Sequence, residues 1–255
     1  MRIFSLASGS KGNALVVEAE GSRLLVDCGL AFSTLSERLG FTPEAGAFAG
    51  VLLTHSHGDH TGGLKVFQEH CPDCAFFANA LTAEVVAHDC ALTDESFATF
   101  ENEQPFSVGP FEVVAFPIPH DTSDPVGFLV RAGGETYFHA TDVGTPLDSI
   151  GRRLAEATCA TLESNHDPVL LRTSGRPRAL IERIEGPRGH LSNEEASAFV
   201  CQYASPRLKR LGLAHLSHNC NAPSLALETM RAALAEAGRG DIALKVYTQN
   251  EVVPL

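Results

Sequence analysis

The sequence has no apolar run long enough to cross a membrane, although 44 % of its 255 residues are apolar. A membrane-spanning helix needs about 20 consecutive apolar residues, and the apolar stretch at the N-terminus is also too short for a signal peptide. The seven cysteines are an odd number and are scattered along the chain, which does not indicate a framework of disulfides. We therefore expect a protein of the reducing cytoplasm that makes no contact with membranes.

Basic residues are also few. Lys and Arg total 19 against 31 Asp and Glu, which gives a net charge of −12. This balance argues against a positively charged coat for non-specific binding of nucleic acid, although it leaves room for a local basic patch. No repeat with a fixed period is present, and the length suits one layered catalytic domain over residues 1–255. Nothing in the sequence indicates an oligomeric state.

A second Cys-x-x-Cys pair is missing as well. Cys71 and Cys74 form one such pair, which could be redox-active or half of a structural zinc site. Because no partner pair occurs at the usual spacing, we favour two free thiols at a helix-to-strand turn that Pro72 interrupts.

The most informative stretch is Thr54–His60, in which three histidines and an aspartate follow the apolar run Val51–Leu53. A strand that ends in His-x-His-x-Asp-His brings imidazoles and a carboxylate to one place. Imidazole binds zinc and similar divalent ions, and a carboxylate can serve a second ion. A polar loop that happens to be rich in histidine is the alternative, but unpaired imidazoles and carboxylates are costly to bury. The pattern therefore predicts a two-metal hydrolytic centre.

Other candidate ligands occupy the same kind of position, where an expected strand stops at a sharp turn. His120, Asp142 and His215 each meet this condition, and Asp27 ends an earlier strand in the same way. His218 lies three residues beyond His215, and spacing alone does not say which of the two faces the metals. We favour His215, because it stands where the strand ends.

The pattern of apolar residues predicts strands and helices in alternating groups, and hence two sheets flanked by helices. An irregular, arginine-bearing loop is expected after residue 162. The strands are expected at 2–6, 14–19, 23–26, 111–118, 126–130, 136–140, 159–162 and 211–215, and the helices at 61–70, 81–90, 193–203 and 224–237.

Taken in chain order, these candidates resemble the five motifs of the metallo-β-lactamase superfamily over nearly the whole chain. The resemblance implies a four-layer αββα sandwich. It implies a first metal held by His55, His57 and His120, and a second held by Asp59, His60 and His215. Asp142 would bridge the two ions. Asp27 would orient a ligand from behind, although it could equally cap the turn before Cys28-Gly29.

Several further segments resemble the YycJ/WalJ group of this superfamily, which is related to PhnP and tRNase Z phosphodiesterases. His57 stands where redox di-iron members have Glu, and Asp142 stands where β-lactamases have Cys. The first difference favours hydrolysis over redox chemistry, and the second points away from hydrolysis of antibiotics. The segments that carry the resemblance are 6–13, 119–121, 124–128, 162–167, 189–193 and 214–218.

The segment Ser8–Asn13 has the composition of a phosphate-binding loop. It offers hydroxyls from Ser8 and Ser10, the ammonium of Lys11, the amide of Asn13 and backbone N–H groups between glycines. The same residues also suit an ordinary tight turn. Lys11 favours the binding role, and we expect His218 to line the same substrate pocket.

His190 precedes Leu191-Ser192 in a segment that resembles the Gly-His-Ser-Thr loop of tRNase Z-like enzymes. The resemblance implies that His190 is a general acid, a role that suits the ordinary pKa of imidazole. The alternative is that His190 simply precedes the helix cap Ser192. Glu163 and His166 are expected to support His190, although His166 could itself be the acid. Together with Asp59, His190 is our candidate for a catalytic residue.

A band of basic residues between Arg172 and Arg210 adds a possible contact for a nucleic-acid backbone, although runs of charge are often only solvated surface. Only Phe199 and Tyr203 are aromatic there, so base stacking is not indicated.

The sequence and the resemblance together predict a hydrolase that uses two divalent ions, zinc or manganese with iron as a further option. By resemblance its substrate is DNA in preference to RNA, cleaved as a 5′-to-3′ exonuclease. The alternatives are a PhnP-like phosphodiesterase for small cyclic substrates and a non-catalytic, metal-binding regulatory partner.

Overall fold

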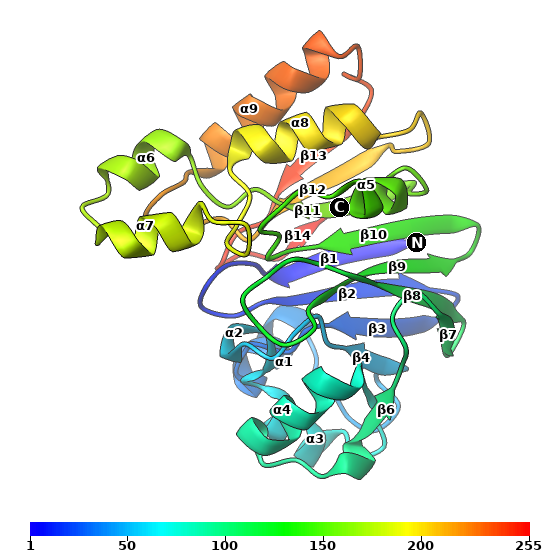
Figure 1. Cartoon of the computed structure of the whole chain (residues 1–255). Helices are drawn as coiled ribbons and strands as arrows, with labels where there is room; N and C mark the ends of the chain where they lie inside the picture. The colour runs from blue at the N-terminus through cyan, green and yellow to red at the C-terminus, as the bar shows by residue number, and fades with distance from the viewer.

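The computed structural model describes all 255 residues and contains two seven-stranded sheets with helices on their outer faces (Figure 1). The first sheet has the spatial order β14 (Val253–Pro254), β1 (Arg2–Ala7), β2 (Ala14–Ala19), β3 (Ser22–Val26), β4 (Gly50–Leu52), β5 (Phe76–Ala78) and β6 (Phe97–Thr99). The second has the order β13 (Ala243–Val246), β12 (Arg210–Ala214), β11 (Cys159–Glu163), β10 (Glu135–Ala140), β9 (Val126–Ala132), β8 (Phe111–Pro117) and β7 (Pro105–Val108).

The helices divide between the two halves of the chain. In the N-terminal half these are α1 (Phe32–Leu39), α2 (Gly58–Thr61), α3 (Leu64–His70), α4 (Ala80–Cys90) and a 3₁₀ turn at Asp94–Ser96. In the C-terminal half these are α5 (Asp148–Leu154), α6 (Pro168–Thr173), α7 (Arg178–Ile184), α8 (Asn193–Tyr203) and α9 (Pro223–Glu236). None of them has the length and apolar content that crossing a bilayer requires.

Alternation of side chains along the strands produces three apolar layers. Along β8, Val113 and Ala115 belong to the cluster between the two sheets, whereas Val114 and Phe116 belong to the cluster that includes residues of α5, α8 and α9. A third cluster joins the outer face of the first sheet to α1, α3 and α4. This arrangement confirms the expected αββα sandwich, because each sheet has two buried faces.

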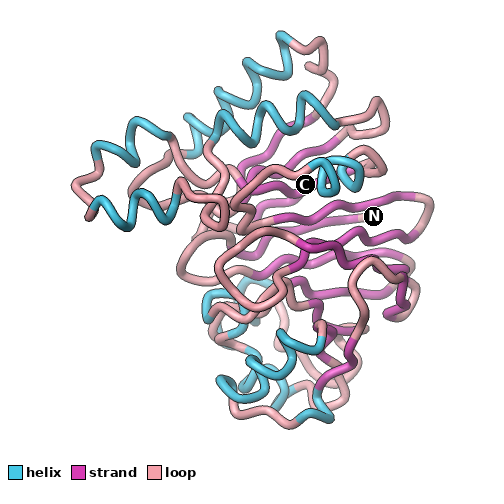
Figure 2. Tube along the Cα trace, viewed as in Figure 1, coloured by secondary structure: helices cyan, strands magenta, loops and turns pink.

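Strand direction decides where the functional residues lie. Strands β3 to β6 are parallel in the first sheet, and β10 to β13 are parallel in the second. Strand β8 pairs antiparallel with β9, which pairs antiparallel with β10, so β8 runs in the same direction as β10. The segments that follow these strands therefore leave each sheet at its carboxyl edge. Figure 2 shows these loops on the left, near the base of the α6–α7 pair.

The expected helix over residues 61–70 is wrong in its continuity, because the structure has α2 and α3 with a break at Gly62 and Gly63. The backbone N–H of Gly63 donates to the carbonyl of Cys28 at 2.8 Å. A Cβ at Gly63 would lie 2.1 Å from the carbonyl oxygen of Leu30. The close approach of the turn after β3 therefore interrupts the helix.

The expectation of an irregular loop after residue 162 is also wrong, since this region contains α6 and α7. Pro168 begins α6, and the side chain of Asp167 accepts a hydrogen bond from the N–H of Leu170. Pro177 precedes the first residue of α7. These are ordinary helix starts, but each helix is too short to show an apolar period. The two helices form a hairpin (residues 168–184) that projects from the body of the molecule (Figure 1).

Cys71 and Cys74 lie where the sequence places them, in the turn between α3 and β5. Both are buried, and neither forms a disulfide. Burial raises the pKa of the Cys74 thiol to about 12. The pair therefore consists of inert thiols in the apolar layer rather than reactive ones.

Candidate metal centre

The histidine cluster is shaped by the single helical turn that follows β4. The backbone N–H groups of His60 and Thr61 both donate to the carbonyl of His57, at 2.9 and 3.1 Å. This turn reverses the chain so that His55 and His60, on either side of His57, point the same way. Their ring centroids lie 4.1 Å apart.

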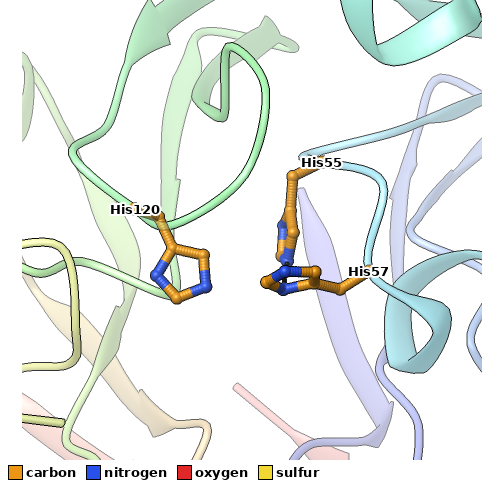
Figure 3. A group of neighbouring side chains, drawn as sticks. All are labelled: His55, His57 and His120. Atoms are coloured by element: carbon orange, nitrogen blue, oxygen red, sulfur yellow. Dashed lines mark hydrogen bonds between the residues drawn. The ribbon is translucent and has the colours of Figure 1, made fainter. Parts of the chain in front are cut away.

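The first ligand group consists of His55, His57 and His120, which face a common space in Figure 3. One ring nitrogen of each lies within 4.8 Å of the others, and Nε2 of His55 is 3.1 Å from Nδ1 of His57. Nδ1 of His120 donates to the carbonyl of Gly189 at 3.2 Å, which leaves its Nε2 for the shared space. Burial lowers the pKa of both His55 and His57, and therefore favours the neutral imidazole that binds metals.

The second ligand group consists of Asp59, His60 and His215, whose ligand atoms also lie within 4.8 Å of one another. Oδ2 of Asp59 is 3.6 Å from Nε2 of His60 and 3.6 Å from Nε2 of His215. Strands β4 and β12 belong to different sheets, so the second ligand group joins residues that follow strands of both sheets (Figure 1).

Asp142 lies between the two groups. Its Oδ1 is 3.6 Å from Nε2 of His120, and its Oδ2 is 3.3 Å from Nε2 of His60. The carboxylate is buried, and Oδ2 has no hydrogen-bond partner. Burial alone would raise the pKa of Asp142, but the imidazoles of His215 and His60 outweigh burial and lower it well below its usual value. The group is therefore an anion between two sets of imidazoles.

Asp27 supports the cluster from behind. Its Oδ2 accepts from Nδ1 of His60 at 2.7 Å, and its Oδ1 accepts from the backbone N–H of Thr54 at 2.9 Å. With Nδ1 of His60 engaged, Nε2 points toward Asp59 and Asp142. Burial alone would lower the pKa of His60, but the carboxylates of Asp27 and Asp142 raise it well above its usual value. These contacts are those expected of a residue that orients a ligand imidazole, one of the two roles considered for Asp27 from the sequence.

Three of these side chains depend on an uncommon backbone conformation. Asp27, Asp142 and His215 have φ values of 58°, 59° and 54°, in the left-handed region. Asp27 and His215 directly follow strands β3 and β12, and Asp142 lies two residues beyond the end of β10. Residues with a Cβ adopt this region at a cost, and such residues concentrate at functional sites. The sharp turns direct all three side chains into the centre.

Glu163, at the end of β11, connects His190 to the cluster. Its Oε1 lies 2.8 Å from Nδ1 of His190 and 3.0 Å from Nδ1 of His215, while its Oε2 accepts from the backbone N–H groups of Val143 and Leu191. Burial alone would raise the pKa of Glu163, but the two imidazoles lower it to about 2. Nδ1 of His215 is therefore occupied, and its buried Nε2, which has no partner, faces Asp59.

The side chain of His166 is not part of this hydrogen-bond network. No hydrogen bond joins His166 to His190, and its buried Nδ1 has no partner. Its backbone instead pairs with Ser192 and accepts from the N–H of Asn193. Of the two expected supports of His190, only Glu163 forms a hydrogen bond with it.

The loop at residues 8–13 borders a cleft of about 240 Å³ beside the cluster. Ser8, Ser10, Lys11 and His218 line this cleft. Oγ of Ser8 also accepts from the backbone N–H of His215 at 2.7 Å. His218 is exposed, with Nδ1 bonded to Asn219, whereas His215 is buried in the second ligand group.

Asn13 does not line the cleft. Its buried side chain accepts from the N–H of Gly9 at 2.8 Å and lies 3.0 Å from Nε2 of His60 and 3.3 Å from Oδ2 of Asp59. It therefore fixes the loop to the second ligand group. The sequence analysis had instead expected Asn13 to bind the substrate.

Sequence reasoning missed the C-terminal side of the cleft. The side chain of Gln249 accepts from the N–H of Lys11 at 3.0 Å and donates to the carbonyl of Gly12 at 2.8 Å. Arg38 in turn donates to the carbonyl of Gln249 at 2.8 Å. These contacts join residues more than 200 positions apart, and no local sequence motif predicts them.

The expected basic band is not one surface. Arg172, Arg178 and Arg183 lie on the hairpin and form ion pairs with Glu185, Glu182 and Asp121. Arg210 begins β12, at the end of the strand opposite the cluster, and donates to Glu135 and to the carbonyl of Met1. Only the hairpin portion and Arg188, which follows the hairpin and donates to the carbonyl of His120, therefore lie on the side of the candidate centre.

The donor set suits divalent cations. Two buried atoms that lack any partner, Oδ2 of Asp142 and Nε2 of His215, face the space between the ligand groups. Nitrogen and carboxylate ligands of this kind fit zinc and manganese. Unsatisfied buried polar atoms are costly in a folded protein, and bound cations would offset that cost.

Comparison with known proteins agrees with this geometry. Residues 22–211 match the Beta-lactamase superfamily domain. The chain is 32 % identical over 239 residues to exodeoxyribonuclease YycJ of Bacillus anthracis, covering 92 % of this chain and 89 % of that one. It is 31 % identical over 250 residues to exodeoxyribonuclease WalJ of Streptococcus pneumoniae serotype 2, covering 95 % and 91 %.

A solved structure supports the fold. The crystal structure of Zn²⁺-bound PqqB from Methylobacterium extorquens superposes with a TM-score of 0.76 at 16 % identity, and the match covers 100 % of this chain and 99 % of that one. The profile match spans most of the chain, and the two exodeoxyribonucleases align over nearly all of it. The chain therefore belongs to the metallo-β-lactamase superfamily, as a metal-dependent hydrolase of its YycJ/WalJ group.

Proposed function

We propose that this protein is a two-metal phosphodiesterase that degrades DNA from the 5′ end, as a cytoplasmic exonuclease. The observation that carries the proposal is the pair of ligand groups with Asp142 between them, beside the carboxyl ends of strands from both sheets. Relatives named exodeoxyribonucleases, about one third identical over nearly the whole chain, support DNA as the substrate class.

In this proposal His55, His57 and His120 hold one ion, and Asp59, His60 and His215 hold the other, with Asp142 as the shared ligand. When bound, the two ions supply a water of lowered pKa and neutralise charge on a phosphodiester. Zinc and manganese both suit the donors, and iron is a further option. We choose His215 over His218, because His215 is buried in the second ligand group and His218 is exposed.

His190 is proposed as the general acid. Nδ1 of His190 donates to Glu163, which leaves Nε2 as the nitrogen that can donate a proton to a leaving alkoxide. Burial alone would lower the pKa of His190, but the carboxylates of Glu163 and Asp142 raise it. A raised pKa favours the protonated ring, which is the form that a general acid needs.

The cleft beside the cluster is proposed to hold a phosphate that flanks the scissile one. Lys11 is exposed and forms no ion pair, so its ammonium is free for an anion. The hydroxyls of Ser8 and Ser10 and the imidazole of His218 face the same cleft. Hydroxyl, ammonium and imidazole donors around one small volume suit phosphate oxygens.

The test uses purified full-length protein with end-labelled single- and double-stranded DNA and RNA, in the presence of Mn²⁺ or Zn²⁺. We expect metal-dependent release of mononucleotides from the 5′ end of DNA, and slower cleavage of RNA. Asp142→Ala is the inactive control, and its folding is checked by circular dichroism. Cleavage only of a small cyclic phosphodiester would replace the exonuclease proposal with a PhnP-like one, and metal binding without any cleavage would leave a regulatory role.

A further inference from the structure

Asp121, the residue after His120, carries a buried oxygen that faces the first ligand group without a hydrogen-bond partner. This Oδ1 lies 3.3 Å from Nε2 of His120 and 3.9 Å from Nε2 of His57. Nε2 of His57 is the outer nitrogen of that ring, because Nδ1 faces His55. The carboxylate therefore lies against two of the three histidines of the first group.

Arg183 of α7 holds the other oxygen of the same carboxylate. Its Nε donates to Oδ2 of Asp121 at 2.6 Å, and a terminal guanidinium nitrogen contacts the same oxygen. Since Arg183 occupies Oδ2, the Asp121 side chain is fixed with Oδ1 toward the histidines. Asp121 and Arg183 are 62 positions apart, so the contact depends on the placement of the hairpin.

The chain after Arg183 fastens the same loop at further points. Arg188 donates to the carbonyls of His120 and Thr122, at 2.8 and 3.3 Å. The carbonyl of Gly189 accepts from Nδ1 of His120. Residues 183–189 thus contact the His120–Thr122 loop through two side chains and one carbonyl. The end of the hairpin and the residues that follow it are therefore joined directly to the loop that carries His120.

We propose that Asp121 is a positioning residue for His57, whose outer Nε2 it faces, and that Arg183 makes this role depend on the α6–α7 hairpin. The inference rests on the ligand set of the proposed function and assigns a role to a residue outside that set. A carboxylate beside the outer nitrogen of a ligand imidazole fixes the orientation of the ring and increases its basicity, and loss of such a partner weakens metal affinity about 10–100-fold. Movement of the hairpin would therefore change the affinity of the first site.

The experiment measures Zn²⁺ binding to the metal-free full-length protein, in competition with a chromogenic chelator and without substrate. We expect two equivalents in the wild type. Asp121→Asn should weaken one equivalent about 10–100-fold and leave the other unchanged. Arg183→Ala should weaken the same equivalent by a smaller factor, and Arg183→Lys should restore most of the loss, because a cation again holds Oδ2.

Arg178→Ala is the matched control, since Arg178 also lies on α7 and pairs with a carboxylate, that of Glu182. Its affinities should equal those of the wild type, and all metal-free variants should unfold at the same temperature. Unchanged affinities in Asp121→Asn would overturn the inference, as would an equal loss in Arg178→Ala and Arg183→Ala. A wild type that binds two ions but cuts no phosphodiester would contradict only the proposed substrate, because this assay does not involve one.

Discussion

Oε1 of Glu163 lies 2.8 Å from Nδ1 of His190, and the Glu163 side chain is completely buried. The carboxylate has no water to stabilise its charge, so its interaction with the two imidazoles and two backbone N–H groups is strong. His190 is therefore held in one orientation and one tautomer, with Nδ1 as the donor. This relationship links the end of β11 to the proposed acid.

Glu163→Gln should move the alkaline limb of the pH profile of kcat to lower pH. The proposed acid is active when protonated, so activity falls as pH rises through the pKa of His190, which the Glu163 carboxylate raises. An amide carries no charge and presents an NH₂ donor to Nδ1, which favours the neutral ring. The profile is measured at saturating metal, because His215 contacts the same carboxylate. An alkaline limb that does not move would contradict a role for Glu163 in tuning His190.

His190→Ala should lose about 10²–10⁴ in kcat on DNA while it keeps its metals. The loss should depend on the leaving group, because a p-nitrophenolate leaves without a proton and a sugar alkoxide does not. A p-nitrophenyl phosphodiester should thus be cut almost normally. His55→Ala is the contrasting variant and should be slow on both substrates, since it removes a proposed ligand. Equal slowing of both substrates by His190→Ala would rule out the acid role and leave His166 to be tested.

The sequence predicted which side chains the structure brings together, because each lies where a strand ends and the direction of the strand fixes the edge it reaches. Asp27, Asp142 and His215 were identified in this way, and all three take the left-handed backbone that such turns require. Strands β1 to β3 and β8 to β12 were predictable for the same reason, since their apolar runs are local, whereas the short strands β5, β6, β7, β13 and β14 were not predicted.

Contacts between distant segments could not be predicted. Nothing near Asp121 indicates that Arg183 will reach it, and nothing near Lys11 indicates Gln249. The basic band shows the same limit, because charges adjacent in sequence separate when Arg210 begins a strand and Arg183 lies on the hairpin. Asn13 was assigned to the substrate from the composition of its loop, whereas its buried amide binds Gly9 and lies against His60.

Lys11→Ala should raise KM more than it lowers kcat, because an ammonium beside the cleft contributes to binding in both the ground state and the transition state. If Lys11 contacts one phosphate, the slope of log Kd against log salt should become shallower by about 0.7–0.9. Lys65→Ala is the control, since Lys65 is also exposed and lies on α3, over the outer face of the first sheet. A salt dependence identical in both variants would exclude Lys11 from the interface.

Two glycines of the centre should respond in opposite ways to alanine. A Cβ at Gly29 would lie 1.7 Å from the carbonyl oxygen of Asp59 and 2.9 Å from the N–H nitrogen of Asn13, whereas a Cβ at Gly58 meets nothing within 4 Å. The Gly29 contact is with backbone, which no rotamer change can relieve. The N–H of Gly29 also donates to Asn13, and the N–H of Asn13 donates to Asp59. Gly29→Ala must therefore displace Asp59 from the second ligand group.

We expect Gly29→Ala to lower the free energy of unfolding by about 1–3 kcal/mol, the usual range for overpacking, and to weaken binding of one metal equivalent. Gly58→Ala should keep wild-type metal affinity and be neutral or slightly stabilising, because Gly58 begins α2 and alanine is the better helix former. Thermal unfolding and metal titration of the two variants side by side provide the measurement. If Gly58→Ala loses metal as Gly29→Ala does, the space around the motif is tighter than these contacts indicate. If neither loses metal, the close approach of the turn after β3 does not hold Asp59 in place.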